Sequence, residues 1–255
     1  MKLLKTIIAL ALVTTFNNCK DLTSKDTQET AINTNIEENV KVIPISHGTL
    51  ILETQEEVIY VDPTGGSEAF KNQKTPTLVL ITDIHGDHLS TPTLEALQLK
   101  NIKIIGPKAV TDKIPSTIGA NVITLSNDET LKHNAINIKA IPMYNLREEA
   151  LKFHPKGRGN GYVLTVNDER IYISGDTEDI PEMRNLKNID KAFVCMNLPY
   201  TMPVDKAAEA VLDFKPKIVY PYHYRGTEGL SDVNLFKSTV NKANESIEVK
   251  LLKWY

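Results

Sequence analysis

A short polar segment, residues 83–88, constrains this chain more than any other feature. It places four potential metal ligands within six positions, namely Asp83, His85, Asp87 and His88. The segment follows the apolar residues 78–81, a pattern typical of a buried strand that ends in a loop. Charged and imidazole groups so close together are costly to bury, whereas a divalent cation neutralises the carboxylates and uses the lone pairs of the ligands. The segment therefore predicts a metal-binding loop, and the alternative is a polar loop at a sheet edge.

Short β-branched runs recur along the chain and predict strands. The predicted strands are residues 40–45, 49–52, 58–61, 78–81, 102–105, 122–125, 136–141, 162–166, 170–173, 191–194 and 218–220. Helical patterns lie among them at residues 93–99, 116–120 and 204–214. Because strand-rich stretches occur in both halves and are interspersed with helices, the chain is predicted to be α/β, with two sheets face to face and helices outside.

The N-terminus has the order of charged and apolar residues that marks a secretion signal. Lys2 and Lys5 precede an apolar run, residues 6–13, that is too short to span a bilayer. Cys19 follows this run and resembles the lipidated cysteine of a bacterial lipoprotein. We therefore expect a signal peptide at residues 1–19 and a lipid anchor that attaches the chain to a membrane of a bacterial cell envelope, facing the periplasm or the surface. A simple secreted protein and an uncleaved anchor are the alternatives.

Composition and charge add further expectations. Residues 20–39 contain few apolar side chains and cannot bury a core, so they are predicted to form a flexible tether before one domain at residues 40–255. The formal net charge of -3 shows no basic excess, which argues against a nucleic-acid partner. The two cysteines, Cys19 and Cys195, lack the spacing of a thiolate zinc site, so a metal must use histidine and carboxylate ligands. Cys195 lies in an apolar run and is predicted to be a buried thiol.

The loop 83–88 resembles the His-x-His-x-Asp-His signature of the metallo-β-lactamase superfamily, with Asp83 where the first histidine normally stands. Other parts of that family's pattern follow in the expected order: Asp62 with Gly65-Gly66, then Gly175-Asp176-Thr177, then His223. The segments Tyr200-Thr201-Met202 and Pro221-Tyr222-His223-Tyr224 are similar to a bacterial branch of metal-dependent hydrolases related to ascorbate-phosphate lactonases. The resemblance covers nearly everything from residue 40 onward.

This resemblance implies an αββα four-layer sandwich of two mixed sheets that binds two divalent metal ions, first of all zinc. It implies Asp83 and His85 as ligands of the first site. It implies Asp87, His88 and His223 as ligands of the second site, and Asp176 as the bridge between the two ions. A water between two cations loses a proton near neutral pH and becomes the nucleophile. Asp87 is expected to orient this water or to pass on its proton. Because Asp83 makes the first site richer in oxygen, manganese and iron are also expected to fit.

The family's third motif normally ends a strand with a histidine, but Asn145 stands at the best match here. Asparagine is a weak ligand, so we expect His154, in the glycine-rich segment 153–162, to complete the first site. Asn145 is the alternative ligand, or lies beside the substrate. If His154 binds metal, its segment becomes a lid whose glycines let it close over substrate. Lys156 and Arg158 would then grip an anionic group, and the alternative is that both are solvated.

Further residues follow the strand predicted at 191–194. Asn197, Tyr200 and Met202 are expected to line the pocket, and the alternative is that Tyr200 and Met202 pack in the core. Asp62 is interpreted as a brace for the metal loop, because a carboxylate at an early turn accepts backbone N–H groups. The remaining histidines, His47 and His133, are interpreted as structural or exposed rather than as ligands.

Together these features predict an enzyme that hydrolyses an ester, lactone or phosphoester bond of a small-molecule substrate. A second hypothesis is a non-catalytic or single-metal surface lipoprotein that binds a ligand on the same fold, because Asp83 and Asn145 depart from the family pattern. Redox chemistry at a diiron centre is disfavoured, since the chain contains no flavin-binding companion domain. Fold and metal site alone do not select the substrate, because pocket loops choose among many chemistries.

Overall fold

The β-branched runs form strands, as predicted, in a computed structural model that describes residues 39–255. The expected signal segment, Cys19 and residues 20–38 of the expected tether lie outside the described residues. The first sheet contains β1 (Lys41–Ser46), β2 (Thr49–Glu53), β3 (Val58–Val61), β4 (Leu78–Leu80), β5 (Lys103–Gly106) and β6 (Asn121–Thr124), in that order. Its first three strands pair antiparallel, and β3 to β6 pair parallel.

A second sheet takes up most of the rest of the chain. Its strands are β7 (Thr130–His133), β8 (Ile136–Met143), β9 (Gly159–Val166), β10 (Glu169–Ile173), β11 (Lys191–Val194), β12 (Ile218–Pro221) and β15 (Glu248–Val249), and their order across the sheet is β15-β12-β11-β10-β9-β8-β7. The strands β7 to β10 pair antiparallel, and β10, β11, β12 and β15 pair parallel. A small separate hairpin is formed by β13 (Arg225–Gly226) and β14 (Gly229–Leu230). Both large sheets are therefore mixed.

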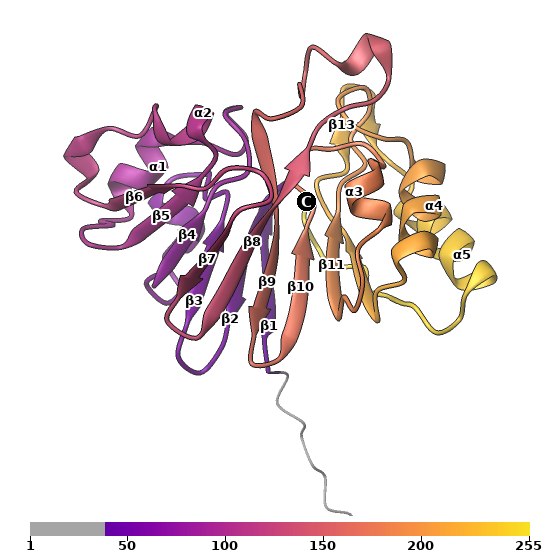
Figure 1. Ribbon diagram of the computed structural model, residues 1–255, viewed down its shortest axis with the longest axis horizontal. Coiled ribbons are helices and arrows are strands. Elements are labelled where there is room, and N and C mark those ends of the chain that lie inside the picture. Colours follow the sequence, from indigo (N-terminus) through magenta and orange to yellow (C-terminus); the bar gives the residue numbers. More distant parts are fainter. Residues whose placement is uncertain (1–38) are drawn as a thin grey trace, which may run out of the picture. The chain divides into compact units, whose positions relative to one another are not determined.

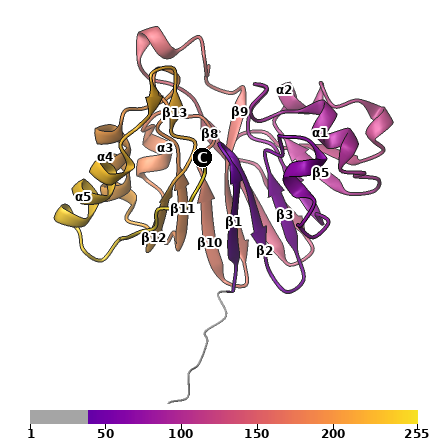
Figure 2. The same cartoon turned by 180° about the vertical axis from the view of Figure 1, so that it is seen from behind.

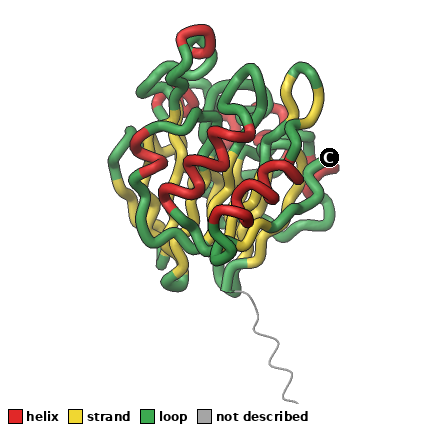
Figure 3. Tube along the Cα trace, turned by 90° about the vertical axis from the view of Figure 1, so that its right-hand side faces the viewer, coloured by secondary structure: helices red, strands yellow, loops and turns green. Residues whose placement is uncertain are grey.

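Helices cover the outer face of each sheet (Figures 1 and 2). The helices α1 (Thr91–Ala96) and α2 (Lys108–Thr111) lie on the first sheet, and α3 (Pro181–Arg184), α4 (Val204–Phe214) and α5 (Val233–Ala243) lie on the second. Figure 3 shows α4 and α5 in front of the strands that they cover. This layering confirms the predicted α/β sandwich of two mixed sheets with helices outside.

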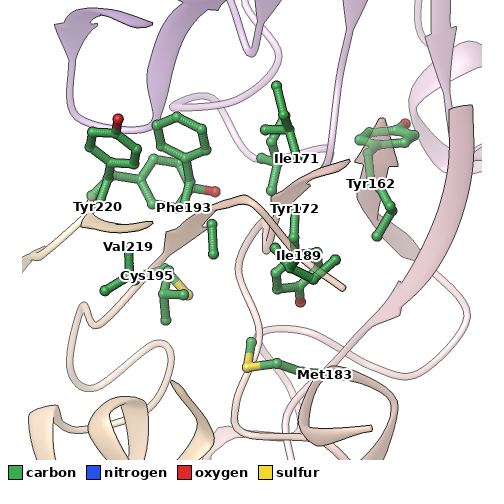
Figure 4. Packing of buried hydrophobic residues seen from close by; sticks show 14 of the residues in the cluster. Tyr162, Ile171, Tyr172, Met183, Ile189, Phe193, Cys195, Val219 and Tyr220 are labelled. Carbon is green, nitrogen blue, oxygen red and sulfur yellow. The ribbon is translucent and has the colours of Figure 1, made fainter. Parts of the chain in front are cut away.

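Successive side chains of a strand point to opposite faces of the sheet. Each large sheet has the other sheet on one face and helices on the other, so its central strands are apolar on both faces. In β2, Leu50 and Leu52 belong to the large cluster between the sheets, whereas Ile51 belongs to the cluster under α1 and α2. The second sheet behaves in the same way in Figure 4. Ile171 points toward the first sheet, and the next residue, Tyr172, points toward the helices, where its ring contacts Phe214 of α4. The rings of Phe193 and Tyr220 stack with centroids 4.9 Å apart.

Helix boundaries differ from the predicted ones where local capping decides them. The helix expected at 93–99 is α1, which begins two residues earlier because the Ser90 side chain accepts a hydrogen bond from the N–H of Thr93. The helix expected at 116–120 is only a 3-10 turn, Ser116–Ile118, that ends at Gly119 with φ 69°. The sequence-based prediction omits α5, whose fully buried side chains are only Phe236 and Val240. Within residues 39–255, no helix is long and apolar enough to cross a membrane.

The topology gathers polar side chains at one end of both sheets. Asp62 follows β3 and the segment 83–88 follows β4 in the first sheet, whereas Asp176 follows β10 and His223 follows β12 in the second. Because the carboxyl ends of parallel strands lie at the same sheet edge, residues more than a hundred positions apart meet there.

Candidate metal centre

The loop after β4 turns tightly and brings its four donor residues to the edge of the sandwich. The N–H groups of His88 and Leu89 both donate to the carbonyl oxygen of His85, at 3.0 and 2.8 Å. The side chains of Asp83 and His88 are fully buried, whereas those of His85 and Asp87 are 40% and 42% exposed. Two donors are therefore enclosed by the protein and two are accessible to solvent.

Asp62 braces this loop. Its Oδ1 accepts a hydrogen bond from the N–H of Thr82 at 2.7 Å, and its Oδ2 accepts one from Nδ1 of His88 at 2.7 Å. The backbone of Asp62 has φ 46°, a left-handed conformation that aims the carboxylate back at the loop. With the Nδ1 proton held by Asp62, the free lone pair of His88 is on Nε2, the tautomer of a metal-binding imidazole.

Charge in this buried pair is set by opposing effects. Burial raises the pKa of Asp62, and the neighbouring His88 lowers it. Burial alone would lower the pKa of His88, but the carboxylates of Asp176 and Asp62 raise it well above its usual value. In the absence of a cation, His88 therefore favours the protonated form.

His88, Asp176 and His223 form the first donor group, which contains two of the ligands expected for the second metal site. Nε2 of His88 and Nε2 of His223 are 3.1 Å apart, and they lie 3.4 Å from Oδ2 and Oδ1 of Asp176 respectively. Two ligands of one tetrahedral zinc ion are about 3.3 Å apart when each is about 2.0–2.1 Å from the metal. Burial alone would raise the pKa of Asp176, but His223 and His88 lower it well below its usual value, so the carboxylate is ionised. Its Oδ1 is buried without a hydrogen-bond partner, as expected of an atom reserved for a metal.

His47, interpreted from the sequence as structural or exposed, extends this group, because His47, Asp87 and His223 make a further set of possible ligands that shares His223 with it. Nε2 of His47 lies 3.2 Å from Oδ2 of Asp87, and Nδ1 lies 2.7 Å from the hydroxyl of Tyr255. The His47 ring also packs on His223, with centroids 3.9 Å apart. A single histidine beside a glycine carries no local signal of this role, because Asp87, His223 and Tyr255 come from distant parts of the chain.

Asp83, His85 and His154 form the second donor group, which corresponds to the first metal site expected from the sequence. Oδ2 of Asp83 lies 2.6 Å from Nδ1 of His85 and 3.8 Å from Nε2 of His154. Nδ1 of His154 faces the carbonyl oxygen of Tyr200 at 3.1 Å, so its Nε2 is directed at the group and has no hydrogen-bond partner. Nε2 of His154 is also 3.3 Å from Oδ2 of Asp176. The structure therefore brings His154 to the place expected of the missing third-motif histidine.

Asn145 lies behind His154 and supports it. Its Nδ2 donates to the carbonyl oxygens of Tyr200 at 2.6 Å and Ala150 at 2.9 Å, and its N–H donates to the carbonyl oxygen of His154 at 2.9 Å. These contacts hold the turn that carries His154. They favour His154 over Asn145 as the residue that faces the donor groups.

The expected lid is only partly a loop, because β9 begins at Gly159. A Cβ on Gly159 would lie 2.1 Å from Cε of Met143, and a Cβ on Gly161 would lie 2.8 Å from the carbonyl oxygen of Ser174. These glycines are thus required by close packing between β8, β9 and the end of β10. They do not act as hinges, and the expectation that the glycines of segment 153–162 let it close is wrong for this half of the segment. Met143 was not singled out from the sequence, yet its Sδ accepts the N–H of Asp176 at 3.0 Å.

The two basic residues of the segment point to different partners. Nζ of Lys156 lies 2.9 Å from Oε1 of Glu182 and over the ring of Tyr144, so its charge is already paired at the surface. Arg158 instead lies against the second donor group, with Nη2 3.2 Å from Oδ2 of Asp83. The alternative of two simply solvated side chains therefore fails for Arg158.

The three residues expected in the pocket lining have mostly structural contacts. Oδ1 of Asn197 accepts the hydroxyl of Thr201 at 2.6 Å and so closes the turn after β11. Tyr200 contributes its carbonyl oxygen, and its ring contacts Phe153 edge-on with centroids 5.0 Å apart. Met202 is fully buried in the large cluster, so its expected place in the pocket is wrong and the core alternative holds.

Two other interpretations agree with the structure. Burial raises the pKa of the Cys195 thiol to about 12, so it is an inert core group. His133 is buried away from the donor groups, with Nε2 3.7 Å from Oε2 of Glu57 and Nδ1 3.2 Å from Nζ of Lys103.

Comparison with known proteins agrees with the fold. The β-lactamase superfamily domain matches residues 41–223, a span that includes both donor groups and His47. The chain belongs to the metallo-β-lactamase superfamily. Relatives described as UPF0173 metal-dependent hydrolases occur in Pyrococcus horikoshii and Staphylococcus carnosus. The Pyrococcus protein is 28% identical to this superfamily member, over 84% of this chain and 96% of that protein. The Staphylococcus protein is 26% identical, over 81% of this chain and 94% of that protein.

Solved structures extend the comparison. A protein of Parabacteroides distasonis, assigned as a metal-dependent hydrolase, is 37% identical with a TM-score of 0.74, and the match covers 83% of this chain and 92% of that one. A metallo hydrolase of Ignicoccus hospitalis, at 22% identity, shares the fold with a TM-score of 0.71 over 84% of this chain and 95% of that one. This superfamily member is therefore a metal-dependent hydrolase.

Proposed function

We propose that this enzyme uses a metal-activated water to cleave an ester, lactone or phosphoester bond of a small-molecule substrate. The observation that carries the proposal is the position of Asp176 between the two donor groups. Its Oδ1 lies 3.4 Å from Nε2 of His223, and its Oδ2 lies 3.3 Å from Nε2 of His154. A carboxylate in that position fits a bridge between two cations, which is the arrangement used for hydrolysis of carbonyl and phosphoryl esters.

The donor set also suggests which ions fit. His88, His223 and Asp176 offer two imidazoles and a carboxylate, which suits zinc. The second group contains Asp83 in place of a histidine and shares Asp176, so manganese or iron fits there as well. Two bound cations would polarise the scissile bond and lower the pKa of a water held between them.

We assign the handling of that water to Asp87. Burial would raise the pKa of Asp87, but hydrogen bonds from His223 and His47 lower it well below its usual value. Asp87 is therefore ionised near neutral pH and, with a side chain that is 42% exposed, can accept a hydrogen bond from a water. Because so acidic a group holds a proton weakly, Asp87 orients the water rather than storing its proton, and the hydrogen bond from His47 holds the carboxylate in place.

The test is hydrolysis by metal-loaded protein of a panel of lactones, carboxylic esters and phosphoesters, with Asp87→Asn as the variant. We expect Asp87→Asn to lower kcat by about 10²-fold or more, since general acid–base groups contribute on that scale. Metal content is measured in parallel. Asp112→Asn is the control, because Asp112 lies at the surface, where it pairs with Lys108. No turnover on the panel by fully loaded protein, or equal turnover by both variants, would contradict the proposal.

One observation supports a single-metal form of the same enzyme as a second candidate. Arg158 makes an ion pair with Asp83 and so places a positive charge beside the second donor group. One tightly held cation at His88, Asp176 and His223 can also activate a water. Metal analysis of purified protein separates the two forms, because only the two-metal form retains two equivalents.

We also propose that the enzyme is a lipoprotein of a bacterial cell envelope, anchored to the membrane through Cys19. The proposal is supported by the order of charged residues, apolar run and cysteine at the N-terminus. Mass spectrometry of the native protein would support it by finding an acylated Cys19 as the first residue, and an intact Met1 would refute it.

A further inference from the structure

We propose that Arg158 competes with a divalent cation for Asp83, so that the two donor groups bind metal in sequence. The group of His88, Asp176 and His223 fills first. The group of Asp83, His85 and His154 fills only when the Arg158 guanidinium leaves. This inference rests on the metal centre of the proposed function and adds a competitor that belongs to the chain itself.

The guanidinium lies where a second cation has to bind. Its Nε is 3.3 Å from Oδ1 of Asp83 and its Nη2 is 3.2 Å from Oδ2, so both carboxylate oxygens are engaged. Nη2 is also 3.5 Å from Nε2 of His85. Oδ2 of Asp83 is the same oxygen that faces the imidazoles of His85 and His154. A dication that used this oxygen would lie against a fixed positive charge, and the two cations exclude each other.

Burial makes the competition strong. The Asp83 side chain is fully buried and that of Arg158 is only 19% exposed, so water screens this pair weakly. The position of Arg158 is also fixed from two other sides. Its Nη2 donates to the carbonyl oxygen of Phe153, and its N–H donates to the carbonyl oxygen of Pro155 at 3.3 Å. A cation entering at Asp83 must therefore replace a charged partner that is already held in place.

The other group has no such competitor. Among the described residues, the recorded ion-pair partners of Asp176 are three histidines, and no lysine or arginine contacts it. Nδ1 of His88 is already fixed by Asp62, so this group is preorganised for a cation. The difference between the groups predicts two binding steps of unequal affinity.

The experiment is a calorimetric titration of the metal-free full chain with Zn²⁺, repeated with Co²⁺ to follow each site by its absorption spectrum. The wild-type chain should bind one equivalent tightly and a second one more weakly. Arg158→Gln should tighten the weaker binding step by roughly tenfold or more, because the cation no longer has to displace a partly buried ion-pair partner of Asp83. The tighter binding step should stay unchanged. Arg158→Lys keeps the charge without the bidentate geometry and should fall between the two.

Lys156→Gln is the matched control. It removes the same charge from the same segment, but Lys156 pairs with Glu182 and not with Asp83. Both binding steps should match the wild type, which separates local competition from the effect of net charge. Thermal unfolding of each metal-free variant verifies that it is folded, and Arg158→Lys keeps the test informative if Arg158→Gln does not fold.

Two equal, tight equivalents in the wild type would overturn the proposal. So would an unchanged weaker step in the Arg158 variants, or loss of that step, which would mean that Arg158 builds the site instead of competing for it. These readouts involve no turnover. Two-step binding with the expected shift but no hydrolysis would therefore leave this inference intact and count against the proposed function alone.

Discussion

At the scale of single residues, the donor imidazoles are oriented through their second nitrogen. Asp62 holds Nδ1 of His88, the carbonyl oxygen of Tyr200 faces Nδ1 of His154, and the Tyr255 hydroxyl lies 2.7 Å from Nδ1 of His47. Each contact leaves Nε2 directed at the donor groups. His223 differs from these three, because its buried Nδ1 has no hydrogen-bond partner in the described part of the chain. Packing against His47 and Gly48 has to position this ring instead.

Gly48→Ala should therefore weaken the metal site through His223. An added Cβ would lie 2.7 Å from Cδ2 of His223, so the ring has to move. We expect the affinity of the tight metal step to fall about 10- to 100-fold, the scale of lost orienting contacts around a metal ligand. Competition with a chelator measures this affinity.

Gly86→Ala is the control for Gly48→Ala. It adds the same methyl group inside the ligand loop, where nothing lies within 4 Å of the new Cβ. Its metal affinity should match that of the wild type. Equal chelator resistance of the two variants would show that Gly48 does not position His223.

At the scale of secondary-structure elements, β9 controls how closely the loops of the second sheet approach one another. Residues Gly159 to Gly161 pair with the end of β8, and Gly161 also lies against the chain that leaves β10. Asp176 is only a few residues further along that chain. The glycines therefore allow the bridging carboxylate to come close to the metal loop.

Gly161→Ala should destabilise the fold, because a new Cβ would lie 2.8 and 2.9 Å from the carbonyl oxygens of Ser174 and Ile173. Both are backbone atoms of a paired strand and its exit, so relaxation is limited. We expect a loss of about 1–3 kcal/mol in the free energy of unfolding, the usual cost of overpacking. Urea denaturation measures it, with Gly86→Ala as the reference. A midpoint equal to that of the reference would mean that the second sheet can open to accept the methyl group.

At the scale of the whole domain, the metal centre joins the two sheets. The loop after β4 comes from the first sheet, whereas Asp176 and His223 follow strands of the second. A cation held by both loops binds the folded state and not the unfolded chain, so it should stabilise the entire sandwich. At 100 times its dissociation constant, such a ligand contributes about 2.7 kcal/mol.

This stabilisation should increase with pH. The pKa of His88 is raised despite burial because Asp176 and Asp62 favour its charged form. In the metal-free protein, that charge contributes stability at pH values below the unfolded pKa and the contribution is lost as pH rises through the folded pKa. A metal ion has to displace the same proton, so it binds more weakly at low pH.

We therefore expect the rise in Tm caused by Zn²⁺ to be larger at about pH 8 than at about pH 6, on either side of the usual histidine pKa. Differential scanning calorimetry with and without chelator measures it. His133→Gln serves as the control, because His133 lies outside the donor groups, and it should retain the same pH dependence. A metal-induced shift that does not change with pH would contradict the role assigned to His88.

The sequence alone was enough for features that depend on near neighbours. Short runs of β-branched and other apolar residues marked most strands, since a strand that is covered on both faces is apolar at successive positions. The density of ligands at 83–88 marked the metal loop, and the turn position of Asp62 marked its brace. Elements with few buried residues, such as α5, escaped notice because their apolar signal is weak.

Only the tertiary structure decided which distant residues meet. His47 and Tyr255 are 208 positions apart and share a hydrogen bond, and Arg158 reaches back 75 positions to Asp83. Strand order and register determine these pairings, and neither is encoded in any local pattern. The same reason explains why Met202 lies in the core and His154 in the site, since a loop residue has no periodicity that reports its direction.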